Sequence, residues 1–228
     1  TAPTEIYTLS LHDALPILDN LYTNSGILTN SNKIRINSTG TLNNSGTLNN
    51  LSNDSTLITN YGLLSNLIVS NTEKGQIANN GRILNGTTGT LKNYHIFTND
   101  SSVINNNIFK NFLVGTITNN RTIENHLTLD NYGTIENKLV MKHINGTFSN
   151  YNILNNDTTG VFTNKKVFIN KKTDASNLDG VSLTGIEGAI TNNGIFNHLQ
   201  DTLTNNGLIT HAIGTAYINI SSTLNNST

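Results

Sequence analysis

Residues 40–50, GTLNNSGTLNN, contain a short motif, the repeat word of this chain, twice in succession. The word is a small or polar residue, an apolar residue, one further residue and then Asn. It recurs from about residue 20 onward, for example as GTLKN (89–93), RTIEN (121–125) and STLNN (222–226). Leu, Ile, Thr and Phe favour the pleated conformation, whereas Asn and Gly tolerate the backbone conformation that a sharp corner needs. Each unit therefore predicts a short β-strand that ends in a turn.

The turn Asn residues recur at steps of six, with a step of eight at intervals. In the best-ordered stretch they are Asn79, Asn85, Asn93, Asn99, Asn105, Asn111, Asn119, Asn125, Asn131, Asn137 and Asn145. An aromatic residue follows a turn Asn at Tyr94, Phe112, Tyr132 and Tyr151, at intervals of 18, 20 and 19 residues. Three units in each coil of 19–20 residues explain both spacings. A meander of hairpins does not, because nothing in it makes every third corner alike.

These spacings predict an all-β chain that forms a single parallel β-solenoid of about ten coils over residues 20–228. Stacked coils share one core that no coil could bury alone. We expect the middle Ile or Leu of each unit to point inward, and Asn at equivalent corners to form ladders of side-chain amides. The four aromatic residues should stack along one edge. Residues 173–187 break the spacing, and we expect them to form a loop that leaves a corner.

The composition excludes several classes of protein. Of 228 residues, 43 are Asn and 33 are Thr, whereas only 12% are charged and the net charge is −1. No apolar run reaches the ~20 residues that span a bilayer, and the low net charge argues against a general nucleic-acid binder. With no Cys, disulfides and thiolate zinc sites are excluded. Leu, Ile, Val and Phe total 65 residues, which disfavours the disorder that polar repeats often show.

Residues 1–19 lie outside the repeat, since they contain both prolines and no Asn. Residues 5–17, EIYTLSLHDALPI, resemble a translated sequencing-adapter peptide; the alternative is a capping segment with Leu11, Leu15 and Leu18 along one side. We leave this segment out of the functional reasoning. Because the chain does not begin with Met and ends within the repeat, we expect it to be an interior fragment of a longer protein.

The repeating word G-T-[LI]-x-N resembles the hemagglutinin-type repeats of large bacterial exoproteins, namely filamentous-hemagglutinin-like adhesins and related autotransporter passengers. GTLNNSGTLNN (40–50) and ITNNGIFN (190–197) carry the resemblance. It implies a right-handed β-helix, export across a Gram-negative outer membrane, and a secreted or cell-surface location. The function that it implies is that of a structural and adhesive rod.

Chemistry-bearing residues are sparse and scattered. Asp and Glu total 14, and Glu124 and Glu136 would fall on different sides of a coil. Glu124 and His126 alternate on one strand, which is too few ligands for a metal. We therefore expect no enzyme, no cofactor and no metal. The alternatives are a carbohydrate-active or carbohydrate-binding β-helix, with carboxylates converging across coils, a flat array of Thr pairs that binds ice or crystalline glycan, and a low-complexity repeat without a specific ligand.

One local bias suggests a partner. KLVMKH (138–143) and KKVFINKK (165–172) lie one to two coils apart and contain six of the 13 basic residues. We expect Lys138, Lys142, Lys165, Lys166, Lys171 and Lys172 either to form a patch that contacts anionic glycans or simply to keep the rod soluble. The expected partners are host or matrix glycans or proteins, reached by weak multivalent contacts. We expect no nucleic-acid binding and no membrane insertion by this segment.

Overall fold

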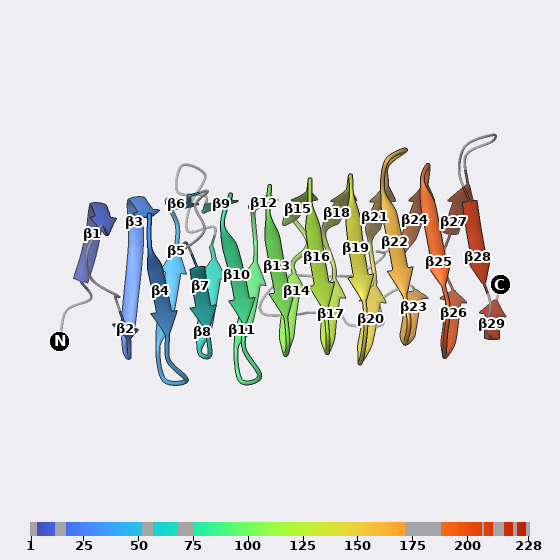
Figure 1. The fold of residues 1–228 in the computed structure, drawn as a ribbon, viewed down its shortest axis with the longest axis horizontal. Coiled ribbons are helices and arrows are strands. Elements are labelled where there is room, and N and C mark those ends of the chain that lie inside the picture. Colours follow the sequence, from blue (N-terminus) through green and yellow to red (C-terminus); the bar gives the residue numbers. More distant parts are fainter. Residues whose placement is uncertain are drawn as a thin grey trace.

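The computed structural model describes residues 4–11, 17–51, 57–67, 75–171, 188–206, 208–211, 217–220 and 223–226. The regular elements in these ranges are β-strands, and they pair in parallel. The strands wind into coils that stack along one axis, from the N-terminal end of an elongated body to its C-terminal end (Figure 1). The prediction of a single parallel β-solenoid is confirmed. No helix in the described ranges is long and apolar enough to cross a membrane.

Each coil contributes three strands, and equivalent strands of successive coils stack into three faces. Face one is a sheet of ten strands, which agrees with the expected number of about ten coils. Its strands are β2 (Ile17–Leu18), β4 (Lys33–Ile36), β7 (Leu57–Asn60), β10 (Arg82–Asn85), β13 (Ser102–Asn105), β16 (Thr122–Asn125), β19 (Val140–His143), β22 (Val161–Asn164), β25 (Ile195–His198) and β28 (Tyr217–Ile220).

Faces two and three form one sheet of 19 strands, because β1 (Thr4–Leu11) and β3 (Leu21–Asn30) run through both. Face two continues with β5 (Thr41–Asn44), β8 (Leu63–Asn66), β11 (Thr90–Asn93), β14 (Ile108–Asn111), β17 (Thr128–Asn131), β20 (Thr147–Asn150), β23 (Val167–Lys171), β26 (Thr202–Asn206) and β29 (Thr223–Asn226). Face three continues with β6 (Thr47–Asn50), β9 (Gln76–Asn79), β12 (Ile96–Asn99), β15 (Thr116–Asn119), β18 (Thr134–Asn137), β21 (Ile153–Asn156), β24 (Ala189–Asn192) and β27 (Leu208–His211).

The corners set the length of each coil. With three two-residue corners the coil has 18 residues, as between Asn119 and Asn137. A four-residue corner at 112–115 lengthens the coil between Asn111 and Asn131 to 20 residues and leaves the strands in register. Such a corner is a turn in which the last amide donates to the first carbonyl, at 2.7–3.0 Å, and it also occurs at 37–40, 86–89 and 157–160. The spacing of the repeat word therefore varies at the corners, while most strands keep four residues.

Each four-residue strand turns its second and fourth residues inward. In β14 and β15 these two positions are buried and the first and third are half-buried, as the alternation of side chains in a strand requires. The second position is apolar, so the expectation that the middle Ile or Leu points inward is confirmed. In the C-terminal half Phe takes this position on faces one and two of successive coils, and neighbouring rings lie 4.9–5.8 Å apart.

The fourth positions form three ladders of buried amides, one on each face. In a ladder, Nδ2 of one Asn donates to Oδ1 of the Asn in the next coil. On face three Asn79 donates to Asn99 and Asn99 to Asn119, both at 2.8 Å. Nδ2 of Asn99 also donates to the Thr122 carbonyl at 2.9 Å. The rungs therefore pair with one another and with backbone carbonyls. Each buried polar group that was left unpaired would cost about 1–3 kcal/mol.

Ten of the eleven predicted ladder residues occupy these ladders, distributed over the three faces. Face two carries Asn24, Asn44, Asn66, Asn93, Asn111, Asn131, Asn150, Asn170 and Asn205. Face three carries Asn30, Asn50, Asn79, Asn99, Asn119, Asn137, Asn156 and Asn192. Face one carries Asn60, Asn85, Asn105, Asn125, His143, Asn164 and His198.

The prediction for Asn145 is wrong. Asn145 is exposed in a three-residue corner, and His143 occupies the rung that follows Asn125. The reason is the strand register: Met141 takes the inward apolar position of β19, so the next inward position is His143. Gly146 then closes the corner with a φ of 78°, a conformation that glycine adopts without strain.

Each ladder runs in one direction, because Nδ2 of each rung donates to Oδ1 of the rung in the next coil. The first rung has no donor beneath it, and the Oδ1 atoms of Asn24 and Asn60 are buried without a hydrogen bond to any described residue. Below Asn60 the equivalent position is Ile36, which cannot donate. Asn164 Oδ1 is unpaired in the same way, because Nε2 of His143 lies 3.2 Å from the Gly146 carbonyl instead. His143 therefore interrupts the ladder of face one.

The four predicted aromatic residues stack along the edge between faces two and three. Tyr94 and Phe112 lie 4.0 Å apart at 9°, Phe112 and Tyr132 lie 6.4 Å apart, and Tyr132 and Tyr151 lie 4.5 Å apart at 3°. Each is the first residue of its corner, so the stack follows from the coil repeat.

Replacing Tyr151 with Leu is expected to lower the free energy of unfolding by about 1 kcal/mol. Leu keeps most of the apolar contact but loses the parallel stack on Tyr132, and such stacks contribute about 0.5–1.5 kcal/mol beyond burial. Urea unfolding followed by circular dichroism measures the change, with Tyr151→Phe as the variant that retains the ring. Equal losses in the two variants would show that the ring contact is unimportant.

The segment outside the repeat, residues 1–19, contributes two strands to the described structure. Residues 4–11 and 17–18 of the segment outside the repeat form β1 and β2, which pair with the first coils. Residues 173–187, the expected irregular loop, lie outside the described residues.

Candidate functional site

The six predicted lysines do not converge on one point. Lys138 lies at the corner before β19, whereas Lys165 and Lys166 lie at the corner after β22, at the opposite edge of face one. Lys142 lies between these edges on β19. Lys171 ends β23 on face two, where its side chain is not described, and Lys172 lies outside the described residues.

Two of these lysines face carboxylates. Lys142 Nζ lies 3.1 Å from Oε1 of Glu124 in the preceding coil, and Lys166 Nζ lies 3.8 Å from Oδ2 of Asp201. Each pair offsets a positive charge on the surface. The described lysines thus form a broad, partly neutralised face rather than a compact anion site.

Glu124 and His126 lie together on the same surface. His126 Nε2 is 3.8 Å from Oε2 of Glu124, whose other oxygen faces Lys142. Glu136 lies on β18 of face three, away from Glu124 on face one, as the spacing predicts. Within the described ranges no three His, Asp or Glu side chains are grouped as metal ligands would be.

The most strongly perturbed titratable group is His143, inside the ladder of face one. Its burial lowers the pKa to about 4, although the Gly146 and Val167 carbonyls act in the opposite direction. Burial likewise lowers the pKa of His198, two coils further along the same ladder. On face two, burial raises the pKa of Asp130 against the opposing effects of Lys110 and Ser149. These three groups are framework residues in the strands.

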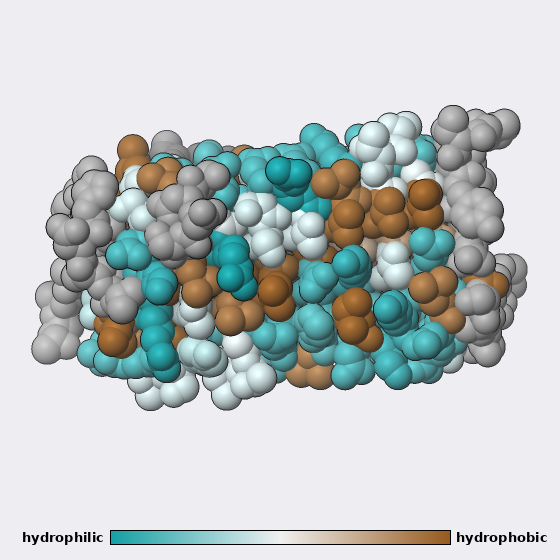
Figure 2. Space-filling model, in the orientation of Figure 1, coloured by the Kyte–Doolittle hydropathy of each residue, from teal (hydrophilic) through white to brown (hydrophobic). Residues whose placement is uncertain are grey.

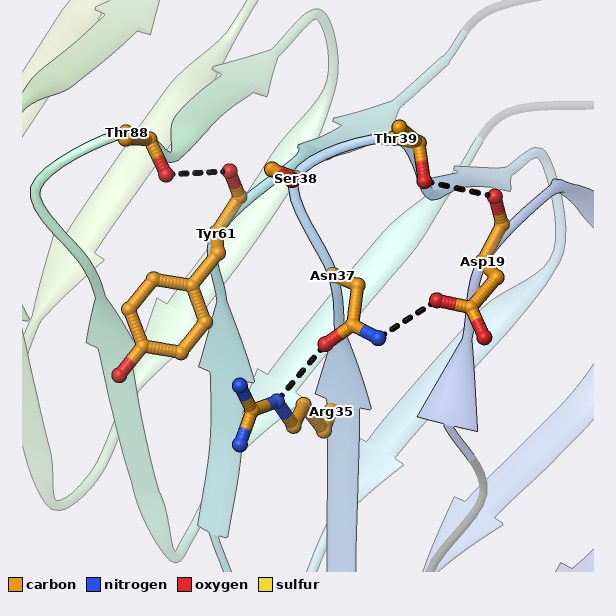
Figure 3. Close-up of a pocket in the computed structure, with 7 residues that line it drawn as sticks. All are labelled: Asp19, Arg35, Asn37, Ser38, Thr39, Tyr61 and Thr88. Atoms are coloured by element: carbon orange, nitrogen blue, oxygen red, sulfur yellow. Dashed lines mark hydrogen bonds between the residues drawn. The ribbon is translucent and has the colours of Figure 1, made fainter.

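An open groove of about 490 Å³ lies at the corner between faces one and two, near the N-terminal end (Figure 3). We call it the corner groove. The four-residue corners at 37–40 and 86–89 flank the two-residue corner at 61–62. A second recess of about 360 Å³ continues it onto face two. The residues lining the corner groove are Asp19, Arg35, Asn37, Ser38, Thr39, Tyr61 and Thr88.

A chain of hydrogen bonds holds the polar side chains of the corner groove. Arg35 Nε donates to Asn37 Oδ1 at 2.8 Å, and Asn37 Nδ2 donates to Asp19 Oδ1 at 2.5 Å (Figure 3). The Arg35 guanidinium carbon lies 5.1 Å from the centre of the Tyr61 ring. The sequence reasoning missed this site, because it treated the corners as connections and left out residues 1–19, which end at Asp19. The available signal was the alternation of NSTG (37–40) and GTTG (86–89) with the short corner at Tyr61–Gly62.

The strand register also bears on the expectation for a Thr array. Outward-facing Thr pairs in one strand occur at Thr116 and Thr118 of β15 and at Thr202 and Thr204 of β26, on different faces. The neighbouring strands of β15 carry Ile96 and Glu136 in place of one Thr each. The described strands therefore do not provide the flat array of aligned pairs that ice or crystalline glycan would require.

Comparison with protein-family models, curated proteins and solved structures found no match to this chain.

Proposed function

We propose that this chain is a structural and adhesive rod of a secreted or surface-attached bacterial exoprotein. The observation that supports the proposal best is the continuity of the ladders, which on face two run from Asn24 to Asn205. Each coil is joined to the next by parallel strand pairing and by the buried ladders, of which only that of face one is interrupted among the described coils, at His143. Ten strands at about 4.8 Å give a rod of about 45 Å.

The surface suits repeated weak contacts better than catalysis. Outward positions recur every coil, so a ligand that contacts one coil meets similar chemistry about 4.8 Å away. Two-carboxylate hydrolysis needs a pair of acidic groups on either side of the bond, whereas Asp19 is the acidic residue among those lining the corner groove. The carbohydrate-binding alternative is supported by that groove.

Location outside a Gram-negative cell is part of the proposal. It is supported by the resemblance of GTLNNSGTLNN (40–50) to exported hemagglutinin-type repeats and by a chain without Cys, which can cross a membrane unfolded without forming disulfides.

Beads coated with the full chain at graded density test the adhesive role. Under flow over a mucin-coated surface, we expect retention to rise more steeply than coating density, because simultaneous weak contacts multiply. Beads coated with heat-unfolded chain at the same densities are the control. Retention that is absent at every density, or equal for folded and unfolded coatings, would contradict the proposal.

A further inference from the structure

The corner groove exists because corner lengths alternate. The corners at 37–40 and 86–89 project with exposed middle residues, whereas the corner between them has two residues. The two projecting corners lie two coils apart, or roughly 10 Å. They are fixed in place, since Thr39 Oγ1 donates to the Asp19 carbonyl at 3.1 Å and Thr88 Oγ1 donates to the Tyr61 carbonyl at 2.8 Å. The groove is therefore a preformed notch between two rigid walls.

Tyr61 lies on the floor of this notch and packs against the corner at 86–89. A Cβ at Gly86 would lie 2.5 Å from two ring carbons of Tyr61, so only glycine allows the ring to pack against the next corner. The Arg35 guanidinium lies over the ring at 5.1 Å, between Tyr61 and Asn37 (Figure 3). An exposed arginine ordinarily samples many rotamers. Here Asn37 and Tyr61 restrict it before any ligand arrives.

The groove presents donors beside acceptors. Arg35 uses Nε on Asn37, which leaves its two terminal nitrogens as donors, and Asp19 receives Asn37 on Oδ1, which leaves Oδ2 as an acceptor. The hydroxyl of Ser38, which is exposed, can serve as either. The arginine and aspartate charges offset each other. This combination matches the hydroxyl groups of a sugar, each of which both donates and accepts, better than it matches an anion.

We propose that the corner groove binds a short stretch of a neutral oligosaccharide, with separate sugar hydroxyl groups bound by the terminal nitrogens of Arg35 and by Oδ2 of Asp19 and the sugar lying against Tyr61. The continuation of the groove onto face two, along Thr41, Thr90 and Lys92, gives the neighbouring sugar residues a hydroxyl-rich path. This inference deepens the proposed adhesive function by naming a ligand class and a site.

Calorimetric titration of the full soluble chain with cellohexaose, maltohexaose and chitohexaose tests the inference, with hexagalacturonate as the acidic comparison. We expect saturable binding of at least one neutral hexasaccharide in the millimolar range or tighter. Arg35→Ala and Asp19→Asn should each weaken it at least tenfold. Arg82→Ala removes an exposed arginine from β10 of the same face, outside the groove, and should leave binding unchanged. Circular dichroism establishes that each variant is folded.

Three results would overturn the inference: no neutral hexasaccharide binds, Arg35→Ala and Asp19→Asn bind like the parent chain, or hexagalacturonate binds more tightly than every neutral probe. These failures are separable from failure of the adhesive function. If coated beads adhere equally with and without Arg35→Ala, the adhesive function stands and the oligosaccharide site is wrong. If the soluble chain binds a neutral hexasaccharide but coated beads are not retained, the oligosaccharide site stands and the adhesive function is wrong.

Discussion

Asn111→Asp is expected to lower the free energy of unfolding by about 4 kcal/mol at neutral pH. Asn111 is fully buried on face two. Its Nδ2 donates to Asn131 Oδ1 at 2.8 Å and lies 3.0 Å from each of the Gly115 and Thr134 carbonyls, while Oδ1 accepts from Asn93. The carboxylate has the same shape but cannot donate. It therefore leaves buried acceptors unpaired, at about 1–3 kcal/mol each, and adds a charge against three oxygens.

Asn145→Asp is the matched control, because it makes the same chemical change at an exposed corner. Surface substitutions of this kind change stability by about 0.5 kcal/mol or less. Urea unfolding followed by circular dichroism compares the two variants, and hydrogen exchange locates the loss. Because coils depend chiefly on their neighbours, exchange should accelerate most in β11, β14 and β17. Equal unfolding midpoints for the two variants would refute the structural role of the ladder.

The contrast between these two asparagines shows what the sequence can predict. Counting Asn along the chain identified the period, because the fourth strand position is Asn in most strands. The same counting passed over His143 and selected Asn145, since residue identity does not reveal strand register. The inward position of Met141 does, and a search for apolar residues two positions before each rung finds His143 and His198 as well.

The surface was harder to predict than the core. Lys138 and Lys165 belong to successive coils, yet Lys138 precedes its strand of face one and Lys165 follows the next, so they lie at opposite edges of that face. The corner groove depends on which corners have four residues and which have two, and on hydrogen bonds from side chains to side chains and backbone carbonyls of neighbouring coils. A consensus of the repeats does not contain the length of each individual corner, because it treats all corners as equivalent. The individual departures from the repeat are therefore where ligand-binding features should be sought.

Acidification is expected to destabilise this rod through His143. Nδ1 of the neutral ring lies 2.8 Å from Asn125 Nδ2 and accepts its hydrogen. Protonation places a second donor against that amide and a charge in a buried position, which agrees with a pKa lowered to about 4 chiefly by burial. The pKa of an unperturbed histidine is about 6.5. Between these values the unfolded chain binds the proton and the folded chain does not, so stability falls as pH falls.

The stabilisation is complete above about pH 6.5 and is lost progressively toward pH 4. Over this whole pH range the free energy of unfolding falls by about 3 kcal/mol, of which about 2 kcal/mol is lost by pH 5. His198, whose pKa is also lowered by burial, acts in the same direction. Urea midpoints measured at pH 7.5, 6 and 5 give the slope. The expected result is a midpoint that decreases steadily over this range.

His143→Asn should reduce this acid sensitivity and raise stability at pH 5. The substituted amide can accept from Asn125 and donate to Asn164 Oδ1, which is buried and unpaired in the parent chain. It thus converts the interruption of face one into the rung that every neighbouring coil uses. His126→Asn removes an imidazole from a partly exposed corner and should retain the acid sensitivity of the parent. If His143→Asn instead unfolds with the parent's dependence on pH, the buried imidazole is not the group that weakens the rod in acid.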